Sequence, residues 1–268
     1  MQPGDASKLV RASGEFGSPS GSFPKPLQSS SIQKSTLKTG SGQTLAKGDL
    51  LVGQVAYYNG ATGKPLGDPG ELNLLIGGSS APGLAKALAC STIGSRVAVT
   101  GTVSQLFGAQ AQTGLSGGST AIFVVDLQKT YPSRATGDPR PAQPGMPTVV
   151  LAPNGQPGIK IPSHDAPTAL RTAILKQGSG PVVKKLDSSS GVLVNYTAVA
   201  WNSPDSVASS SWLNGSPTVW PSSALQGFTP PASVLKQIVG KNVGSQLLIV
   251  TPGSDATAYV IDILGIWK

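Results

Sequence analysis

Residues 175–183 read LKQGSGPVV and residues 37–45 read LKTGSGQTL, so the chain contains nearly the same glycine-rich turn twice. The similarity extends upstream of this turn. GSPSGSFP at 17–24 matches GQPGIKIP at 155–162, and these positions differ by 138, the same spacing that separates residue 37 from residue 175. A constant spacing over such a span indicates an internal repeat.

The repeat continues to the end of the sequence, although loops of different length change the spacing. GLAKALACSTIGS at 83–95 resembles SVLKQIVGKNVGS at 233–245, and TAIFVVDL at 120–127 resembles TAYVIDIL at 257–264. Both copies share one order of predicted elements: a strand, the glycine-rich turn, a strand, a variable loop, a short helix and two further strands. We therefore predict two similar domains, at residues 15–132 and 148–268.

Two segments fall outside the repeat. Residues 1–14 are predicted to be disordered or to form only a partial N-terminal segment. SRATGDPRPAQPGM at 133–146 is rich in Pro, Gly and Arg, a composition typical of chain that connects domains. We predict a linker at 133–147.

The periodicity of apolar residues indicates an α+β fold. In VLVNYTAVA at 192–200 every second side chain is apolar, which predicts a strand with Tyr196 turned toward the core. In SVLKQIVG at 233–240 the apolar residues have helical spacing, with Ser233 as the expected N-cap and Gly240 where the helix should stop. Each copy is thus expected to be an antiparallel sheet curled around one short apolar helix.

The charge of the chain argues against nucleic acid as a partner. The 268 residues carry a net charge of +8, but only 12% of them are charged and the Lys and Arg residues are scattered. Nucleic-acid binding usually requires a basic stripe with interleaved aromatic residues. No run of the roughly 20 apolar residues needed for a transmembrane helix is present.

The scarcity of Cys and His excludes several kinds of catalytic site. Cys90 is the only cysteine, so no internal disulfide or multi-cysteine metal site can form, and we expect it to be a small buried side chain. His164 is the only histidine, and although Ser163 and Asp165 flank it, the members of a catalytic triad rarely adjoin in sequence. We expect no metal and no cofactor.

The order of motifs in the second copy resembles a known enzyme family. LKQGSG is followed by VNYTAVAW, then by SSW with a glycine three residues later, by an apolar helix ending in GKNVGS, and by a terminal strand that contains an aspartate. This series is similar to the FKBP-type peptidyl-prolyl cis–trans isomerases, above all to bacterial envelope members with two such domains. The resemblance implies an antiparallel sheet around a short helix, with an apolar substrate pocket between them.

The same resemblance implies the partners and the location. The partners would be proline-containing peptides or unfolded exported proteins, bound by a monomer that is secreted or lies in the cell envelope. QPGDASK after Met1 lacks the apolar core of a signal peptide, which leaves a cytoplasmic location open.

In the second copy the resemblance is uneven. Tyr196 stands at the strand tyrosine of the family, whereas the phenylalanine and aspartate of its Phe-Asp-Ser-Ser-Trp motif fall on Ala208 and Ser209. The family's floor tryptophan falls on Val234, its terminal-strand phenylalanine falls on Val260, and its lid is reduced to PGSDATA at 252–258. The resemblance places this pocket at Tyr196, Ser209, Trp212, Trp220, Phe228, Val234 and Val260, with Trp220 and Phe228 as replacement surface.

The first copy departs from the family at other positions. Its loop at 101–119 is long, and Phe107 stands where the family has a lid tyrosine. Phe123 matches the terminal-strand phenylalanine, Leu84 takes the floor position, and Val55 replaces the strand tyrosine, while Asp68 aligns only loosely with the aspartate. The resemblance therefore places the first pocket at Val55, Asp68, Leu84, Phe107 and Phe123.

Three functions remain open on the sequence. The first is a prolyl isomerase, which needs no nucleophile because the barrier of about 18–20 kcal/mol arises from amide resonance. The second is a peptide-binding or chaperone module that has the fold without the activity, in which Tyr196, Phe123 and Leu84 are plain core residues. The third is a pair of immunoglobulin-like adhesive domains, which a helix in each core would exclude.

Overall fold

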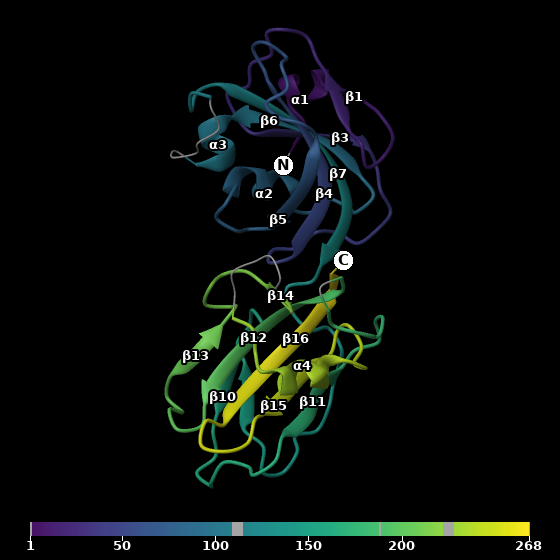
Figure 1. Cartoon of the computed structure of the whole chain (residues 1–268). Coiled ribbons are helices and arrows are strands. Elements are labelled where there is room, and N and C mark those ends of the chain that lie inside the picture. The colour runs from purple at the N-terminus through teal and green to yellow at the C-terminus, as the bar shows by residue number, and fades with distance from the viewer. Residues whose placement is uncertain (1, 109–114, 188, 222–227, 268) are drawn as a thin grey trace. The chain divides into compact units, whose positions relative to one another are not determined.

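The computed structural model describes residues 2–108, 115–187, 189–221 and 228–267. The chain divides into two compact units, Met1–Tyr131 and Pro132–Lys268, which we call unit 1 and unit 2 (Figure 1). Each unit is mostly strand with few helices. None of the helices within the described ranges has the length and apolar character needed to traverse a lipid bilayer.

Unit 1 contains one antiparallel sheet and a hairpin. The sheet has the strand order β3-β6-β7-β4-β5, so β3 and β5 are its edges. Its strands are β3 (Gln33–Lys38), β4 (Leu50–Asn59), β5 (Gly70–Leu75), β6 (Arg96–Thr102) and β7 (Thr120–Tyr131). The helices are α1 (Asp5–Leu9), α2 (Pro82–Leu88) and α3 (Val103–Phe107), and β1 (Arg11–Ser13) pairs with β2 (Ser20–Ser22).

Both faces of this sheet are covered, which explains its long apolar strands. On one face, here called the helix face, Leu84, Ala87 and Leu88 of α2 pack against inward residues of the strands. On the back face, Val10 and Ala12 of the N-terminal segment pack against a second apolar cluster. Alternate residues of β7 belong to the two clusters, because successive strand side chains point to opposite faces.

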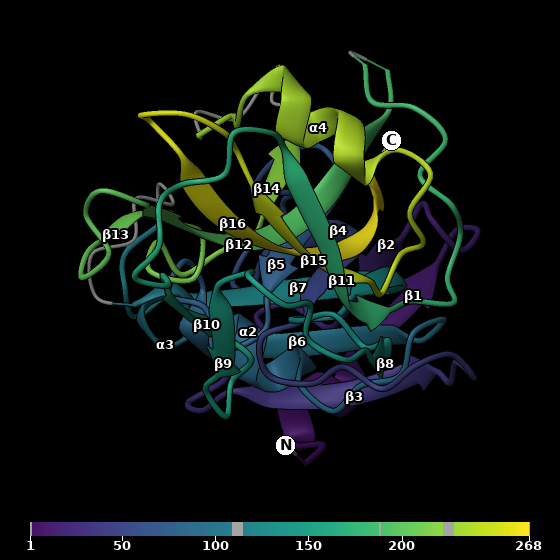
Figure 2. The ribbon, with the colours of Figure 1, turned by 90° about the horizontal axis from the view of Figure 1, so that it is seen from below.

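Unit 2 repeats this arrangement. Its strands β11 (Arg171–Gln177), β15 (Gln246–Val250), β16 (Thr257–Trp267) and β12 (Gly191–Ala200) follow one another across the sheet as β3, β6, β7 and β4 do in unit 1 (Figure 2). The edge beyond β12 consists of β13 (Val207–Ser210) and β14 (Thr218–Trp220), and β8 (Asp138–Pro139) borders β11. β9 (Thr148–Leu151) pairs with β10 (Pro157–Lys160), and α4 spans Ala232–Ile238.

Two matching glycines upstream of the repeated turn have the same backbone conformation. Gly17 and Gly155, which are 138 residues apart, have φ angles of 99° and 97°. Only glycine adopts this region readily, so both copies require it there. The predicted strand at 192–200 and the predicted helices are confirmed, and the helices lie in the two cores, which excludes the immunoglobulin-like alternative.

Two segments differ from their predicted state. The described N-terminal residues 2–14 include α1 and β1 instead of being disordered, and the N–H groups of Ala6 and Ser7 donate to Gln33 Oε1 over 3.0 and 3.1 Å. Residues 133–147 pack into unit 2 instead of linking two domains. The N–H of Ala135 donates to Asp262 Oδ2 over 3.1 Å, and Asn195 Nδ2 donates to the Ser133 carbonyl. Sequence composition predicted irregular or disordered chain in both segments, but these hydrogen bonds hold each segment against the rest of its unit.

Two local predictions were also wrong. Cys90 is exposed rather than buried. It lies two residues after the end of α2, where the chain turns with a φ of 59°. The N-cap of α4 is Pro231 rather than Ser233, which lies within the first turn of the helix. Pro231 has a φ of −53° and a ψ of 150°, the non-helical conformation that an N-cap residue takes.

Each back face carries a buried carboxylate at the same register position. Asp126 in β7 pairs with Arg96 in β6, with Nε to Oδ1 at 2.6 Å and Nη2 to Oδ2 at 2.7 Å. Asp262 in β16 instead accepts a hydrogen bond from Gln246 Nε2 in β15, over 2.6 Å. The ion pair of unit 1 is therefore replaced in unit 2 by a buried acid with a neutral partner.

This replacement predicts a pH dependence for unit 2. Burial raises the pKa of Asp262 from 3.8 to about 6, against the opposing effect of hydrogen bonds from Ala135 and Gln246. Between these two values the folded state holds a proton that the unfolded state has released. This proton on Asp262 therefore contributes fully to the free energy of unfolding of unit 2 below pH 3.8, and the contribution is lost as the pH rises through about 6.

Asp262→Asn should abolish this dependence. We expect the free energy of unfolding of the parent unit 2 to fall by about 2–3 kcal/mol between pH 4 and pH 7, and that of the variant to stay level. All four tryptophans lie in unit 2, so tryptophan fluorescence during urea unfolding measures this unit alone. Equal pH profiles for parent and variant would contradict the assignment to Asp262.

Candidate functional site

An apolar hollow of about 510 Å³ opens on the helix face of unit 1. Strands β4, β5 and β7 form one side, and α2, α3 and the residues just before α2 form the other. Its walls are mainly aliphatic and aromatic, with Asn73 and Ser80 as polar lining residues. The principal lining residues are Val55, Tyr57, Leu72, Leu84, Phe107 and Phe123.

Three aromatic rings form one wall of the hollow. The rings of Tyr57 and Phe123 stack with centroids 5.9 Å apart and an interplanar angle of 9°. The ring of Phe107 meets Phe123 at 5.7 Å and 56°. Register explains the first pair, because Tyr57 in β4 lies directly opposite Phe123 in β7. Such packed rings give a rigid surface that costs little entropy when a ligand binds.

A short helix that the sequence analysis treated as loop positions Phe107. Thr102 and Gln105 form a capping box, in which the Gln105 N–H donates to Thr102 Oγ1 and the Thr102 N–H donates to Gln105 Oε1. The sequence pattern typical of a capping box, Thr-x-x-Gln, was present at residues 102–105. Phe107 is the last residue of this helix, and Gly108 ends it with a φ of 92°.

The backbone also supplies a free hydrogen-bond donor. Ala81 lines the hollow at the start of α2 and is 6% exposed. Its carbonyl accepts from the Ala85 N–H, but its own N–H donates to no described residue. A nearly buried N–H without an acceptor is costly, so a ligand carbonyl placed there would gain a hydrogen bond.

Four of the five residues predicted for the first pocket line the hollow: Val55, Leu84, Phe107 and Phe123. Asp68 does not line it and is exposed. Tyr57, two residues after Val55 on the same face of β4, was not predicted. Its hydroxyl oxygen lies so close to the Gly67 backbone that a side chain at position 67 would clash with it.

On the helix face of unit 2 the corresponding space is occupied by the chain itself. The ring of Phe228 stacks on Tyr196 at 5.5 Å and on Tyr259 at 6.3 Å. Beneath it lies Trp220, which is fully buried and donates from Nε1 to the Phe228 carbonyl over 2.8 Å. Phe228 remains 39% exposed, so it covers the tyrosines from the solvent side.

The two tyrosines under Phe228 are held in a largely apolar environment. Burial raises the pKa of both Tyr196 and Tyr259. The Tyr196 hydroxyl lies 2.7 Å from Ser209 Oγ, and Val234 of α4 is fully buried in the same cluster. Five predicted residues thus come together here: Tyr196, Ser209, Trp220, Phe228 and Val234.

Two residues predicted for the second pocket lie elsewhere. Val260 belongs to the back-face cluster, because Tyr259 is the residue equivalent to Phe123. Register establishes this, since Tyr196 pairs with Ile261 as Val55 pairs with Val125. The alignment of the terminal strands was one residue out, and a one-residue shift moves a side chain to the opposite face.

Trp212 is the second displaced residue. Its ring lies beside Gly155 in the β9–β10 turn, where a Cβ on the glycine would stand 3.3 Å from Trp212 Cη2. Its indole nitrogen is buried and forms no hydrogen bond with any residue in the described part of the chain. The Ser-Ser-Trp motif therefore contributes a serine, Ser211, to the sheet, where its Oγ accepts from the Tyr196 N–H, while the tryptophan packs near the hairpin.

No protein-family model and no curated protein matches the chain. Among solved structures, it is similar to the three FKBP domains of wheat FKBP73, with 12% identity, a TM-score of 0.38, and coverage of 88% of this chain and 95% of that one. It is also similar to FkpA from Escherichia coli, with 20% identity, a TM-score of 0.33, and coverage of 38% of this chain and 49% of that one.

A third similar structure is a peptidyl-prolyl cis-trans isomerase from Pseudomonas syringae. The identity is 16% and the TM-score 0.33, with coverage of 37% of this chain and 74% of that one.

Proposed function

We propose that both units are FKBP-like domains and that unit 1 is a peptidyl-prolyl cis–trans isomerase. The observation that carries the proposal is the hollow of unit 1, an apolar space of about 510 Å³ walled by Tyr57, Phe107 and Phe123. A proline ring is small and apolar and matches such a space. The N–H of Ala81 at the same hollow, which donates to no described residue, supplies a donor for a carbonyl of the bound peptide.

The chemistry requires only that the X-Pro bond rotate. The barrier of about 18–20 kcal/mol comes from resonance that places partial charge on the imide oxygen and nitrogen. An apolar surrounding stabilises the planar, charge-separated form less than water does, and so favours the twisted state in relative terms. Interactions that are stronger in the twisted state than in either planar state lower the barrier. No acid, base, metal or cofactor is needed.

We propose that unit 2 is catalytically silent at its helix face. Phe228 covers Tyr196 and Tyr259, the surface that a substrate would otherwise contact. Unit 2 is then a scaffold or binding module, and only unit 1 isomerises. The partners are proline-containing segments of unfolded proteins, and assistance to exported proteins outside the cytoplasm is part of this proposal.

The test is the exchange rate of a short X-Pro peptide, measured by NMR with the full chain at micromolar concentration. Uncatalysed exchange takes about 10–100 s, and we expect the protein to accelerate it at least about tenfold. Saturable peptide binding without acceleration would favour a second candidate, a peptide-binding module without activity. The observation that favours this candidate is Val55, which stands where the isomerase family has its strand tyrosine. A result with no peptide binding and no acceleration would refute both candidate functions.

A further inference from the structure

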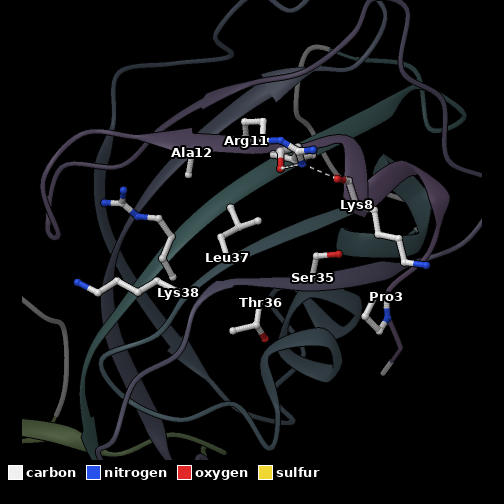
Figure 3. A pocket seen from close by; sticks show the side chains of 10 residues that line it. Pro3, Lys8, Arg11, Ala12, Ser35, Thr36, Leu37 and Lys38 are labelled. Carbon is white, nitrogen blue, oxygen red and sulfur yellow. Dashed lines mark hydrogen bonds between the residues drawn. The ribbon is translucent and has the colours of Figure 1, made fainter.

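A second concave region of unit 1 lies beside the edge strand β3, away from the hollow (Figure 3). Its volume is about 610 Å³. Val10, Ala12 and Leu37 belong to the back-face cluster or pack against it, and they provide its apolar part. We call this region the edge groove. It shares no lining residue with the hollow.

Unit 2 shows what such an edge can accept. Strand β11 occupies the position of β3, with the same bulge between its residues 174 and 176 as β3 has between 36 and 38. Along this edge runs β8, where Pro139 pairs with Lys176 in antiparallel register. The Arg140 N–H then donates to the Leu175 carbonyl over 2.9 Å. An extended segment of chain therefore completes the sheet of unit 2.

In unit 1 no described strand pairs with the outer edge of β3, although Ser7 Oγ of α1 lies 2.8 Å from Ser35 Oγ. No backbone hydrogen bond from a described residue outside the sheet reaches β3 between Ser35 and Lys38. Strand edges with free N–H and C=O groups pair readily with another extended segment. The bulge position Leu37 is equivalent to Leu175, whose carbonyl accepts from Arg140 in unit 2.

The charges around the edge groove select the kind of segment. Lys8, Arg11 and Lys38 line it, all three are exposed, and none forms an ion pair with a described residue. The charge of Arg96 is matched by Asp126. No Asp or Glu is among the lining residues. Figure 3 shows Lys38 and Lys8 extending toward opposite ends of the groove, with Leu37 between them.

We propose that the edge groove of unit 1 binds an extended acidic peptide segment of a partner protein as an additional antiparallel strand next to β3. Backbone hydrogen bonds to β3 provide affinity, and acidic side chains at alternate positions meet Lys8, Arg11 and Lys38. Because this site and the hollow are separate, one unit can hold a client by an acidic strand while its hollow acts on a proline elsewhere. The proposal does not depend on the isomerase activity.

Fluorescence polarisation with a dye-labelled (Glu-Thr)5 decapeptide and the full chain tests the charge requirement. We expect saturable binding that weakens with salt, and a loss of affinity of at least about tenfold in the Arg11→Glu/Lys38→Glu variant. Lys160→Glu/Lys236→Glu changes the net charge equally at exposed positions of unit 2 and should alter affinity less than about twofold. If the double variant unfolds, Lys38→Gln should still weaken binding measurably.

A backbone-modified peptide tests strand addition. The same decapeptide N-methylated at alternate residues keeps its charges but cannot donate along one edge, and we expect it to bind at least about tenfold more weakly. Hydrogen exchange of the Ser35–Lys38 amides should slow when the unmodified peptide binds. Equal affinity of the methylated peptide, equal competition by single-stranded DNA of the same length, or no binding at millimolar concentration would overturn the proposal.

Discussion

Asp126→Ala is expected to lower the free energy of unfolding of unit 1 by about 3–5 kcal/mol, because it leaves the Arg96 guanidinium buried without its counter-charge. Asp126 is fully buried and Arg96 is 7% exposed. The same carboxylate accepts from the Gly17 N–H over 2.6 Å, and Arg96 donates to the carbonyls of Gly14 and Glu15. The pair thereby fastens the N-terminal hairpin to the back of the sheet.

The measurement must separate the two units. Tryptophan fluorescence reports unit 2 alone, whereas hydrogen exchange of the β6 and β7 amides reports unit 1. We expect Asp126→Ala to accelerate exchange in β6 and β7 and to leave the fluorescence transition unchanged. Asp68→Ala makes the same change at an exposed site and should alter stability by less than about 0.5 kcal/mol. A loss below about 1 kcal/mol in Asp126→Ala would show that the buried pair contributes little.

Short-range patterns predicted the elements of the fold. The alternation in β12 and the helical spacing in α4 gave both elements within one or two residues, since each is encoded by local periodicity. The predicted linker failed for a different reason. Pro and Gly in 133–147 indicate irregular backbone, but irregular backbone can still pack, and Asp262 and Asn195 hold this segment from distant strands.

The hollow was only partly predictable. Phe107, Phe123 and Leu84 were found through motif order, while Tyr57 was missed although the period of β4 places it beside Val55. The donor at Ala81 has no sequence signature, because it depends on the three-dimensional arrangement in which no described residue accepts from its N–H. The same holds for Phe228. The sequence predicted that its aromatic side chain lines a pocket, but only its position over Tyr196 shows that it occupies the helix face of unit 2.

The register of the last strand shows how small an alignment error suffices. TAIFVVDL and TAYVIDIL can be aligned on their first letters or on their aspartates. The aspartates give the correct alignment, because Asp126 and Asp262 both pair with the first residue of the preceding strand in the sheet. A buried polar residue fixes the register more reliably than apolar letters, which are interchangeable in a core.

Phe107→Ala is expected to lower prolyl isomerase activity about tenfold, whereas Tyr196→Ala should change it less than about twofold. Phe107 walls the open hollow of unit 1, and about 1.4 kcal/mol of lost transition-state contact accounts for a tenfold effect. Tyr196 lies beneath Phe228, where a substrate does not reach it. The readout is kcat/KM from NMR exchange of an X-Pro peptide with the full chain.

The matched control is Phe16→Ala, which removes a ring from unit 1 outside the hollow. Phe16 is 41% exposed and lies under Lys38 Nζ, so its loss should leave kcat/KM unchanged. The three variants together separate a pocket wall from general destabilisation, because all remove one aromatic ring. Equal losses of kcat/KM in Phe107→Ala and Tyr196→Ala would place activity in both units and contradict the proposal that unit 2 is catalytically silent. A greater loss in Tyr196→Ala would place the active hollow in unit 2, and Phe228 would then have to move aside for the substrate.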